Sequence, residues 1–212
     1  MTTQDSKVTN QLNNRLTQSK FKQKELTEIY TFTESFSTDE VKSIVDYCSK
    51  LPTEDAEIGS NMEVVSVNDK LRSSIVRWVP MNEDTKFIYD RLLDMVIEAN
   101  EELWDFDINS LFESVQYTEY YGSDNGHYDW HLDIGSGYDY RKISITVQLS
   151  DENDYSGGNL IIKIGPDGTE TIIDREMGLS TIFPSYLLHR VNNIETGVRR
   201  SLVLWVSGPP LR

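Results

Sequence analysis

The sequence predicts a single α+β domain, and three observations lead to that prediction. The chain has 212 residues, which is enough for one substantial core and too few for two catalytic lobes. Helical periodicity of apolar residues is confined to the part of the chain before Trp104. The remainder carries short apolar runs separated by Gly, Asn and Asp, which favours a second half built as a β-sandwich or barrel.

Two helices are expected in the first half. Residues 37–40 supply a hydroxyl cap and an acidic first turn, so the first helix is expected over roughly 38–50, ended by Pro52. The second is expected over 85–104, where apolar residues recur at intervals of three and four. Both helices then present an apolar face on which a sheet can pack.

The strands are expected after the second helix, each bounded by turn residues. Gly165-Pro166-Asp167-Gly168, for example, is typical of a tight turn between two strands. The expected strands lie at about 113–121, 128–133, 142–149, 159–164, 169–173, 180–183, 188–192 and 199–206.

Charge is distributed unevenly along the chain. Acidic residues outnumber basic ones by 35 to 20, for a formal net charge of −15, which disfavours nucleic acids and anionic membranes as partners. Residues 1–24 are polar and basic and are expected to form a flexible arm, with residues 25–212 as the single folded domain. No secretory signal or membrane-spanning run is found, so we expect a soluble, cytoplasmic protein.

A metal site, if there is one, must use histidine and carboxylate, because Cys48 is the only cysteine. The histidines are His127, His131 and His189. Alternate residues of a strand share one face, so either His127-x-Asp129 or His131-x-Asp133 could reach one ion together with His189. Strand periodicity leaves both pairs open. Two imidazoles and a carboxylate bind one face of Fe(II) and leave three positions open; a catalytic zinc would use a similar site.

An arginine follows the distal histidine at a distance that suits an anion pocket. In the predicted strand over 199–206, Arg199 and Ser201 share a face. An inward guanidinium would offer a carboxylate a planar, bidentate fork that never loses its charge. The alternative is an ordinary salt bridge from Arg199 to one of the many acidic residues.

Taken in order, these residues resemble the prolyl-4-hydroxylase-type division of the 2-oxoglutarate/Fe(II) dioxygenases. The resemblance covers about residues 29–208 and is strongest from Phe112 onward. It is carried by Gln116, Tyr121, Trp130-His131-x-Asp133, Arg141 with Ser144, Tyr155-x-Gly157-Gly158-x-Leu160, Phe183-Pro184, His189-x-Val191 and Gly197-x-Arg199-x-Ser201.

The resemblance implies a fold, a site and a set of small molecules. The fold is a double-stranded β-helix, or jelly roll, braced by N-terminal helices. The implied iron ligands are His131, Asp133 and His189, which favours His131 over His127. Arg199 would bind the distal carboxylate of 2-oxoglutarate. Tyr121, Ser144 and Ser201 are further candidates for contact with this co-substrate. O2 would be the oxidant, ascorbate a candidate reductant, and Gln148 stands where related proteins often have an aromatic residue.

The expected activity is hydroxylation of an unactivated C–H bond, with a prolyl residue of a peptide or protein as the leading analogy. One alternative is an oxygenase acting on a free amino acid, another small molecule or a modified nucleobase. Nucleic-acid demethylases of the superfamily typically place a second Arg six residues after the first, where this chain has Trp205. Another alternative is a non-catalytic jelly-roll module with a structural metal. The loop 134–141 suits a substrate wall or lid, or an ordinary exposed loop.

Overall fold

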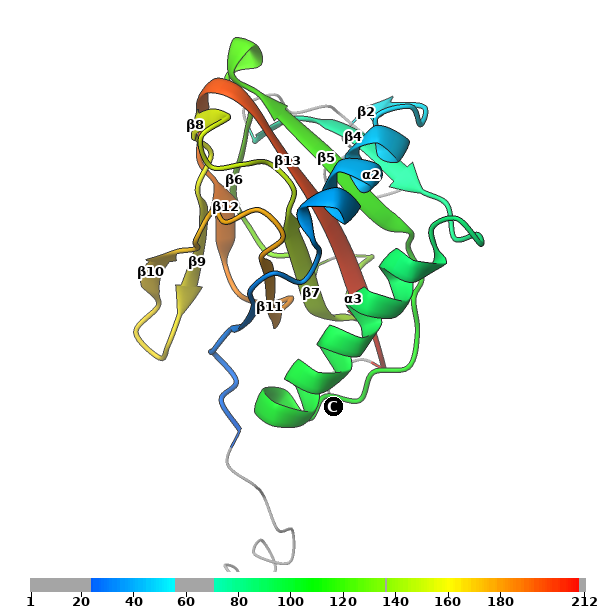
Figure 1. Cartoon of the computed structure of the whole chain (residues 1–212). Helices are drawn as coiled ribbons and strands as arrows, with labels where there is room; N and C mark the ends of the chain where they lie inside the picture. Colours follow the sequence, from blue (N-terminus) through cyan, green and yellow to red (C-terminus); the bar gives the residue numbers. More distant parts are fainter. Residues whose placement is uncertain (1–23, 56–70, 136, 210–212) are drawn as a thin grey trace, which may run out of the picture.

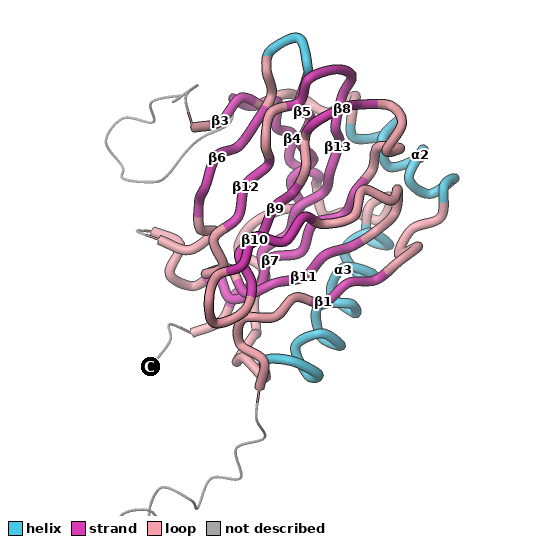
Figure 2. The backbone as a smooth tube through the Cα atoms, turned by 90° about the vertical axis from the view of Figure 1, so that its left-hand side faces the viewer, coloured by secondary structure: helices cyan, strands magenta, loops and turns pink. Residues whose placement is uncertain are grey.

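The computed structural model describes residues 24–55, 71–135 and 137–209 (Figure 1). Two antiparallel sheets face one another in these ranges, and the helices α2 and α3 cover the outer side of the larger sheet (Figures 1 and 2). The expected arm over residues 1–24 lies almost wholly outside the described residues. None of the helices in the described ranges combines the length and the apolar character needed to cross a lipid bilayer.

The larger sheet has eight strands and the smaller one five. The larger sheet runs in the order β1 (Tyr30–Phe32), β11 (Ser180–Pro184), β7 (Arg141–Gln148), β13 (Ile194–Ser207), β5 (Val115–Tyr121), β4 (Ile75–Val79) and β2 (Glu54–Asp55), with β8 (Tyr155–Gly157) also paired to β13. The smaller sheet runs in the order β10 (Thr169–Ile172), β9 (Leu160–Ile164), β12 (His189–Val191), β6 (His127–His131) and β3 (Arg72–Ser73).

The helices form where the sequence predicts them. Helix α2 (Thr38–Cys48) begins with a capping box, in which the Ser37 hydroxyl accepts from the Glu40 amide and the Glu40 carboxylate accepts from the Ser37 amide. Helix α3 (Lys86–Ala99) continues into a π-helical turn, η1 (Asn100–Trp104), so the predicted helix over 85–104 widens in its last turn.

Strand alternation divides the core into two parts. Leu202 and Leu204 of β13 face α2 and α3 and join the cluster between the helices and the larger sheet. Ile162 of β9 belongs to a second cluster between the two sheets. Polar residues such as Ser201 occupy the inner face of β13, so the space between the sheets is apolar at one end and polar at the other.

The predicted jelly-roll core is confirmed, and the strands after Trp104 fall close to their expected positions. Strand β13 begins at Ile194, earlier than the predicted 199, because its first residues pair with β8. Strands β1, β2, β3, β4 and β8 were not among the predicted elements. Several of them are too short to show a periodic pattern, and they form because neighbouring strands offer free edges.

Candidate active site

The pairing of β6 with β12 brings together residues that are far apart in the sequence. His131 ends β6, His189 begins β12, and the two residues lie directly opposite each other. Asp133 follows β6 by two residues, and its backbone N–H donates to the carbonyl of Ser185 at 3.0 Å. One ligand atom from each of His131, Asp133 and His189 lies within 4.8 Å of the other two.

Both imidazoles are oriented by backbone carbonyls. Nδ1 of His131 lies 2.8 Å from the carbonyl oxygen of Asp129, and Nδ1 of His189 lies 2.9 Å from that of Leu187. A proton on Nδ1 therefore leaves the lone pair of each Nε2 directed at Asp133. The Nε2 atoms lie 3.7 Å and 3.5 Å from its carboxylate oxygens, for His131 and His189 respectively.

Electrostatics favours a neutral imidazole beside an ionised carboxylate. Burial, and then the neighbouring His189, lower the pKa of His131 to about 3. Burial works against ionisation of Asp133, but the two imidazoles and the Ser144 hydroxyl outweigh it, so its pKa is lowered. In the described ranges, no Lys or Arg lies within 4.0 Å of the Asp133 carboxylate. The Asp133 carboxylate is therefore buried beside two imidazoles and a hydroxyl.

The Asp133 carboxylate is held from the larger sheet. The hydroxyl of Ser144, on β7, donates to Oδ2 of Asp133 at 2.6 Å and lies 2.9 Å from the hydroxyl of Ser185. Arg141 donates to the carbonyl oxygen of Asp133 at 3.1 Å and forms a two-point ion pair with Glu113. These contacts fix both the backbone and the side chain of Asp133 although it lies beyond the end of β6.

The ring of Tyr128 and the guanidinium of Arg72 lie beside His131. The ring of Tyr128 lies 3.5 Å from that of His131, nearly parallel to it, and the guanidinium of Arg72 lies 4.7 Å from the Tyr128 ring centre. Arg72 is buried, and within the described ranges no carboxylate lies within 4.0 Å of it. The neighbouring Trp130 ring contacts Lys163, at 4.9 Å from its centre, and Arg190, at 4.6 Å.

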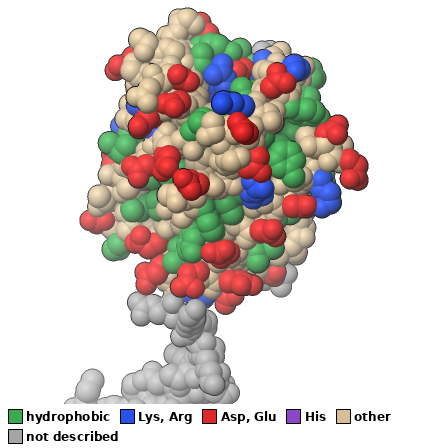
Figure 3. Space-filling view, viewed as in Figure 1, with side chains coloured by type: hydrophobic (Ala, Val, Ile, Leu, Met, Phe, Trp, Pro, Cys, Tyr) green, Lys and Arg blue, Asp and Glu red, His purple; other side chains and the backbone are tan. Residues whose placement is uncertain are grey.

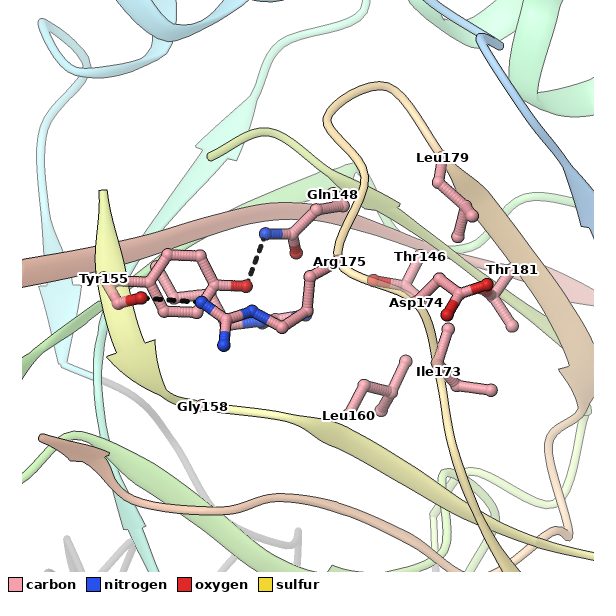
Figure 4. A pocket seen from close by; sticks show the side chains of 11 residues that line it. Thr146, Gln148, Tyr155, Gly158, Leu160, Ile173, Asp174, Arg175, Leu179 and Thr181 are labelled. Carbon is pink, nitrogen blue, oxygen red and sulfur yellow. Dashed lines mark hydrogen bonds between the residues drawn. The ribbon is translucent and has the colours of Figure 1, made fainter. Parts of the chain in front are cut away.

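Arg199 lines a pocket between the two sheets (Figure 4). The volume of this pocket is about 260 Å³ when its solvent-open mouth is included. Arg199 is 4 % exposed, and its guanidinium lies 5.7 Å from the Tyr120 ring centre and donates to the Ser201 hydroxyl at 3.4 Å. No Asp or Glu of the described residues pairs with it, so the alternative of an ordinary salt bridge is not observed. The hydroxyl of Thr181, also buried in this lining, has no hydrogen-bond partner among the described residues.

The remaining wall of the pocket is polar and aromatic. Gln148 donates to the Tyr155 hydroxyl at 2.8 Å, which gives Gln148 a place in the lining that the sequence left open (Figure 4). Gly158 has φ +63°, and a Cβ there would lie 3.3 Å from Cδ of Arg199 and 2.0 Å from Cδ1 of Ile194. The absence of a side chain at Gly158 therefore makes room for the arginine.

The three further residues predicted to contact the co-substrate, Ser201, Ser144 and Tyr121, lie in different places. Ser201 lies beside Arg199, as expected from strand alternation. Ser144 does not line the Arg199 pocket and instead bonds Asp133. Tyr121 is not brought to the site either, which corrects the expectation, because its neighbour Tyr120 takes the inner face of β5.

The placement of Tyr121 follows from the register of β5 and β13. Tyr120 lies opposite Arg199, whereas Glu119 lies opposite Arg200 on the other face. Tyr121 shares that outer face, where burial and then the charge of Glu119 raise its pKa. A tyrosine contact with the Arg199 pocket therefore belongs to Tyr120.

Comparison with known proteins gives the same picture for this half of the chain. Residues 115–207, from β5 to β13, match the model of the 2OG-Fe(II) oxygenase superfamily. A PKHD-type hydroxylase of Rippkaea orientalis is 29 % identical over 187 residues, covering 84 % of this chain and 78 % of the relative. A PKHD-type hydroxylase of Prochlorococcus marinus is 27 % identical over 171 residues, covering 78 % and 71 %.

Solved structures agree with the fold. A prolyl-4-hydroxylase of Pseudomonas putida has a TM-score of 0.68 at 18 % identity and covers 86 % of this chain and 94 % of its own. A prolyl hydroxylase of Trichoplax adhaerens, solved with a peptide fragment of hypoxia inducible factor, also has a TM-score of 0.68, at 17 % identity, covering 98 % and 94 %. The family uses Fe(II), 2-oxoglutarate and O2. Together these similarities support an enzyme of the prolyl-4-hydroxylase type among the 2OG-Fe(II) oxygenases.

Proposed function

We propose that this chain hydroxylates a prolyl residue of a peptide or protein, with Fe(II) held by His131, Asp133 and His189 and with 2-oxoglutarate bound by Arg199. The observation that carries the proposal is the pairing of two incomplete sites. Two imidazole nitrogens converge on a carboxylate that has no Lys or Arg of the described residues within 4.0 Å, and the buried guanidinium of Arg199 has no carboxylate partner among those residues. A divalent ion and a dicarboxylate complete both.

The donor set fits Fe(II). Both Nδ1 atoms lie within hydrogen-bonding distance of backbone carbonyls, so each Nε2 is free to bind a metal, and Ser144 leaves the second oxygen of Asp133 available. One face of the ion would be bound by protein and the other left open. Iron bound there, with 2-oxoglutarate and O2, supplies the oxidising chemistry that places a hydroxyl on the substrate carbon.

The chain's own residues bind and orient the co-substrate. The Arg199 guanidinium offers two parallel donors to the distal carboxylate, and the Thr181 hydroxyl, which lacks a partner, offers a third. Ser201 supports the guanidinium from its own strand. Leu160, Ile173 and Leu179 line the same pocket and keep bulk water from the aliphatic part of the co-substrate.

A peptide substrate is supported by the surroundings of Trp205, which lies on β13 six residues after Arg199. Trp205 is 7 % exposed, and its indole N–H has no partner among the described residues. It lies opposite Ser144 in the register and carries the Arg141 guanidinium 3.9 Å from its ring centre. An indole N–H beside the reacting centre suits a backbone carbonyl, and its ring suits the apolar face of a proline. The Trichoplax relative was solved with a peptide.

A small-molecule substrate is the alternative that the sequence left open. A polyanionic substrate is disfavoured by the acidic side chains that dominate the face in Figure 3. Ascorbate as reductant and a cytoplasmic location remain predictions from the sequence.

Metal binding tests the ligand set directly. His131→Ala should abolish tight binding of Fe(II) under anaerobic conditions, measured by calorimetry, because it removes one of three protein donors. His127→Ala is the matched control, since it removes a histidine of the same strand whose Nδ1 is bonded to the Asn125 carbonyl. Loss of binding in the His127 variant with retention in the His131 variant would overturn the assignment.

Co-substrate turnover tests the reaction. Succinate formation from 2-oxoglutarate, with Fe(II) and ascorbate, should be measurable in the wild type and should rise when a proline-rich peptide is added. Turnover that ignores such peptides and responds to free proline would favour the small-molecule alternative. Absence of succinate under all these conditions would exclude the proposed chemistry.

A further inference from the structure

The pocket that holds Arg199 contains a second guanidinium, that of Arg175. Arg175 lies in the connection between β10 and β11 and lines the pocket together with Tyr155 and Gln148 (Figure 4). No sequence motif marks Arg175, which lies in an irregular connection. Asp174 also lines the pocket but is exposed, and it makes no ion pair with either arginine.

The orientation of Arg175 is set from one side only. Its Nη2 donates to the carbonyl oxygens of Glu152 at 2.7 Å and Tyr155 at 2.6 Å, and its guanidinium lies 4.0 Å from the centre of the Tyr155 ring. The Tyr155 ring is itself held by Gln148. These contacts make Arg175 a wall of defined position rather than a mobile surface side chain.

The Arg175 guanidinium still has an N–H group that can donate to a ligand. Its Nε is buried and has no hydrogen-bond partner among the described residues, and no carboxylate of those residues lies within 4.0 Å of the group. The pocket lining thus carries two guanidiniums and one exposed carboxylate. The lining therefore has a net positive charge, which an anionic ligand would neutralise.

We propose that Arg175 is a specificity-determining residue of the co-substrate pocket, which binds the distal carboxylate together with Arg199 and limits the length of the 2-oxo diacid. The inference rests on the proposed function, because it presupposes that 2-oxoglutarate occupies this pocket. Arg199 anchors the carboxylate from β13. Arg175, which is hydrogen-bonded to the backbone of Tyr155, closes the pocket. A diacid that is longer by one methylene would therefore clash with a guanidinium that is held in place.

The test is a binding measurement on the full chain loaded with Mn(II), a divalent ion that does not support turnover. Calorimetry gives the dissociation constants of 2-oxoglutarate and of 2-oxoadipate, which is one methylene longer. Arg175→Ala should weaken the binding of 2-oxoglutarate by about tenfold, as for loss of a charge-assisted hydrogen bond. The ratio of the dissociation constants of 2-oxoadipate and 2-oxoglutarate should fall by about the same factor. Arg175→Lys should retain part of the affinity and most of the length preference.

Arg91→Ala is the matched control. Arg91 also carries its guanidinium over an aromatic ring, that of Phe36 at 4.8 Å, and donates to a backbone carbonyl, that of Ser35, but it lies on helix α3 outside the pocket. Its loss should leave both dissociation constants unchanged. A general loss of stability would change the dissociation constants of both diacids by the same factor. The ratio of the two constants therefore measures the effect of Arg175 on the length of the diacid.

The outcomes separate the two proposals. If Arg199→Ala weakens 2-oxoglutarate but Arg175→Ala and Arg175→Lys change neither affinity nor preference, the role of Arg175 is refuted and the proposed function stands. If the wild type binds no 2-oxoglutarate, or if Arg199→Ala has no effect, the proposed function itself fails. If Arg175→Ala does not fold, as judged by its thermal transition, the Arg175→Lys ratio decides.

Discussion

Arg199 and Arg200 follow one another on β13, and their guanidinium groups have opposite surroundings. The Arg200 group lies on the helix side of the sheet, where its Nε donates to the carboxylate of Glu119 at 3.0 Å. Glu119 is 3 % exposed and also accepts from Arg77 at 2.5 Å and from the Tyr117 hydroxyl at 3.2 Å. The Arg199 group lies on the inner side and has no carboxylate partner in the described ranges.

The difference separates a structural charge from one that requires a ligand. Burial works against ionisation of Glu119, but the bonds from Arg77 and Arg200 outweigh it and lower its pKa, so this group is complete within the chain. A buried cation without such a partner destabilises the free protein and is stabilised when an anion arrives. The decisive difference between the two arginines is that Arg200 has a carboxylate partner and Arg199, although more deeply buried, has none among the described residues.

The largest expected effect is the loss of affinity for 2-oxoglutarate when Arg199, and not Arg200, is replaced. Arg199→Met should weaken 2-oxoglutarate by on the order of 100-fold, the effect of losing a two-point bond to a carboxylate, while Arg200→Met should change the affinity less than threefold, roughly the noise of such a comparison. Calorimetry on the Mn(II)-loaded variants checks both. Equal losses in the two variants would mean that both arginines act through the strand and neither through a ligand.

The next effect concerns the free energy of unfolding. Glu119→Gln should destabilise the chain by about 3 kcal/mol at pH 7, because it leaves two arginines on the helix side without their anion. The folded-state pKa of Glu119 is lowered from its ordinary value of 4.5, so this stabilisation is present above pH 4.5 and is lost as the pH falls below it.

Urea unfolding at a series of pH values measures the difference between wild type and variant. The difference should shrink below pH 4.5. A difference that stays constant across the acid range would show that the carboxylate charge contributes nothing to stability. Co-substrate affinity of the folded variant should stay near that of the wild type.

Much of this arrangement could be predicted from sequence patterns, and the reasons for the misses are physical. His131 and Asp133 were expected on one strand face, yet β6 ends at His131 and Asp133 is directed to the site by Ser144 and by the backbone of Ser185. His127 could not be excluded by periodicity. What separates it from His131 is the pairing of β6 with β12, which is a long-range property.

Tyr121 illustrates the same limit at a finer scale. The family resemblance implies a role for Tyr121 in the site, but in a strand a shift of one residue reverses the face. Only the register with β13 shows that Tyr120, not Tyr121, lies opposite Arg199. Arg72 and Arg175 were missed because a two-residue strand and an irregular connection carry no periodic signal.

A smaller effect is expected at Gly158, which makes room for Arg199. Gly158→Ala should cost about 1–2 kcal/mol of stability from the left-handed backbone and should weaken 2-oxoglutarate several-fold, roughly, by displacing the arginine. Gly168→Ala is the matched control, because Gly168 has a similar φ of +67° with no neighbouring atom within 4 Å of a Cβ. Equal co-substrate affinity in the two variants would mean that the crowding at Gly158 does not reach the pocket.

The smallest effect tests which tyrosine belongs to the pocket. The Tyr120 ring lies beside the Arg199 guanidinium, so Tyr120→Leu should weaken 2-oxoglutarate by roughly two- to fivefold, as for loss of a partly desolvated cation–π contact. Tyr121→Phe removes a hydroxyl on the helix side, near Glu119, and should leave the affinity unchanged. A loss in the Tyr121 variant alone would place that hydroxyl in the site, and the register of β5 against β13 would then have to differ by one residue when the co-substrate binds.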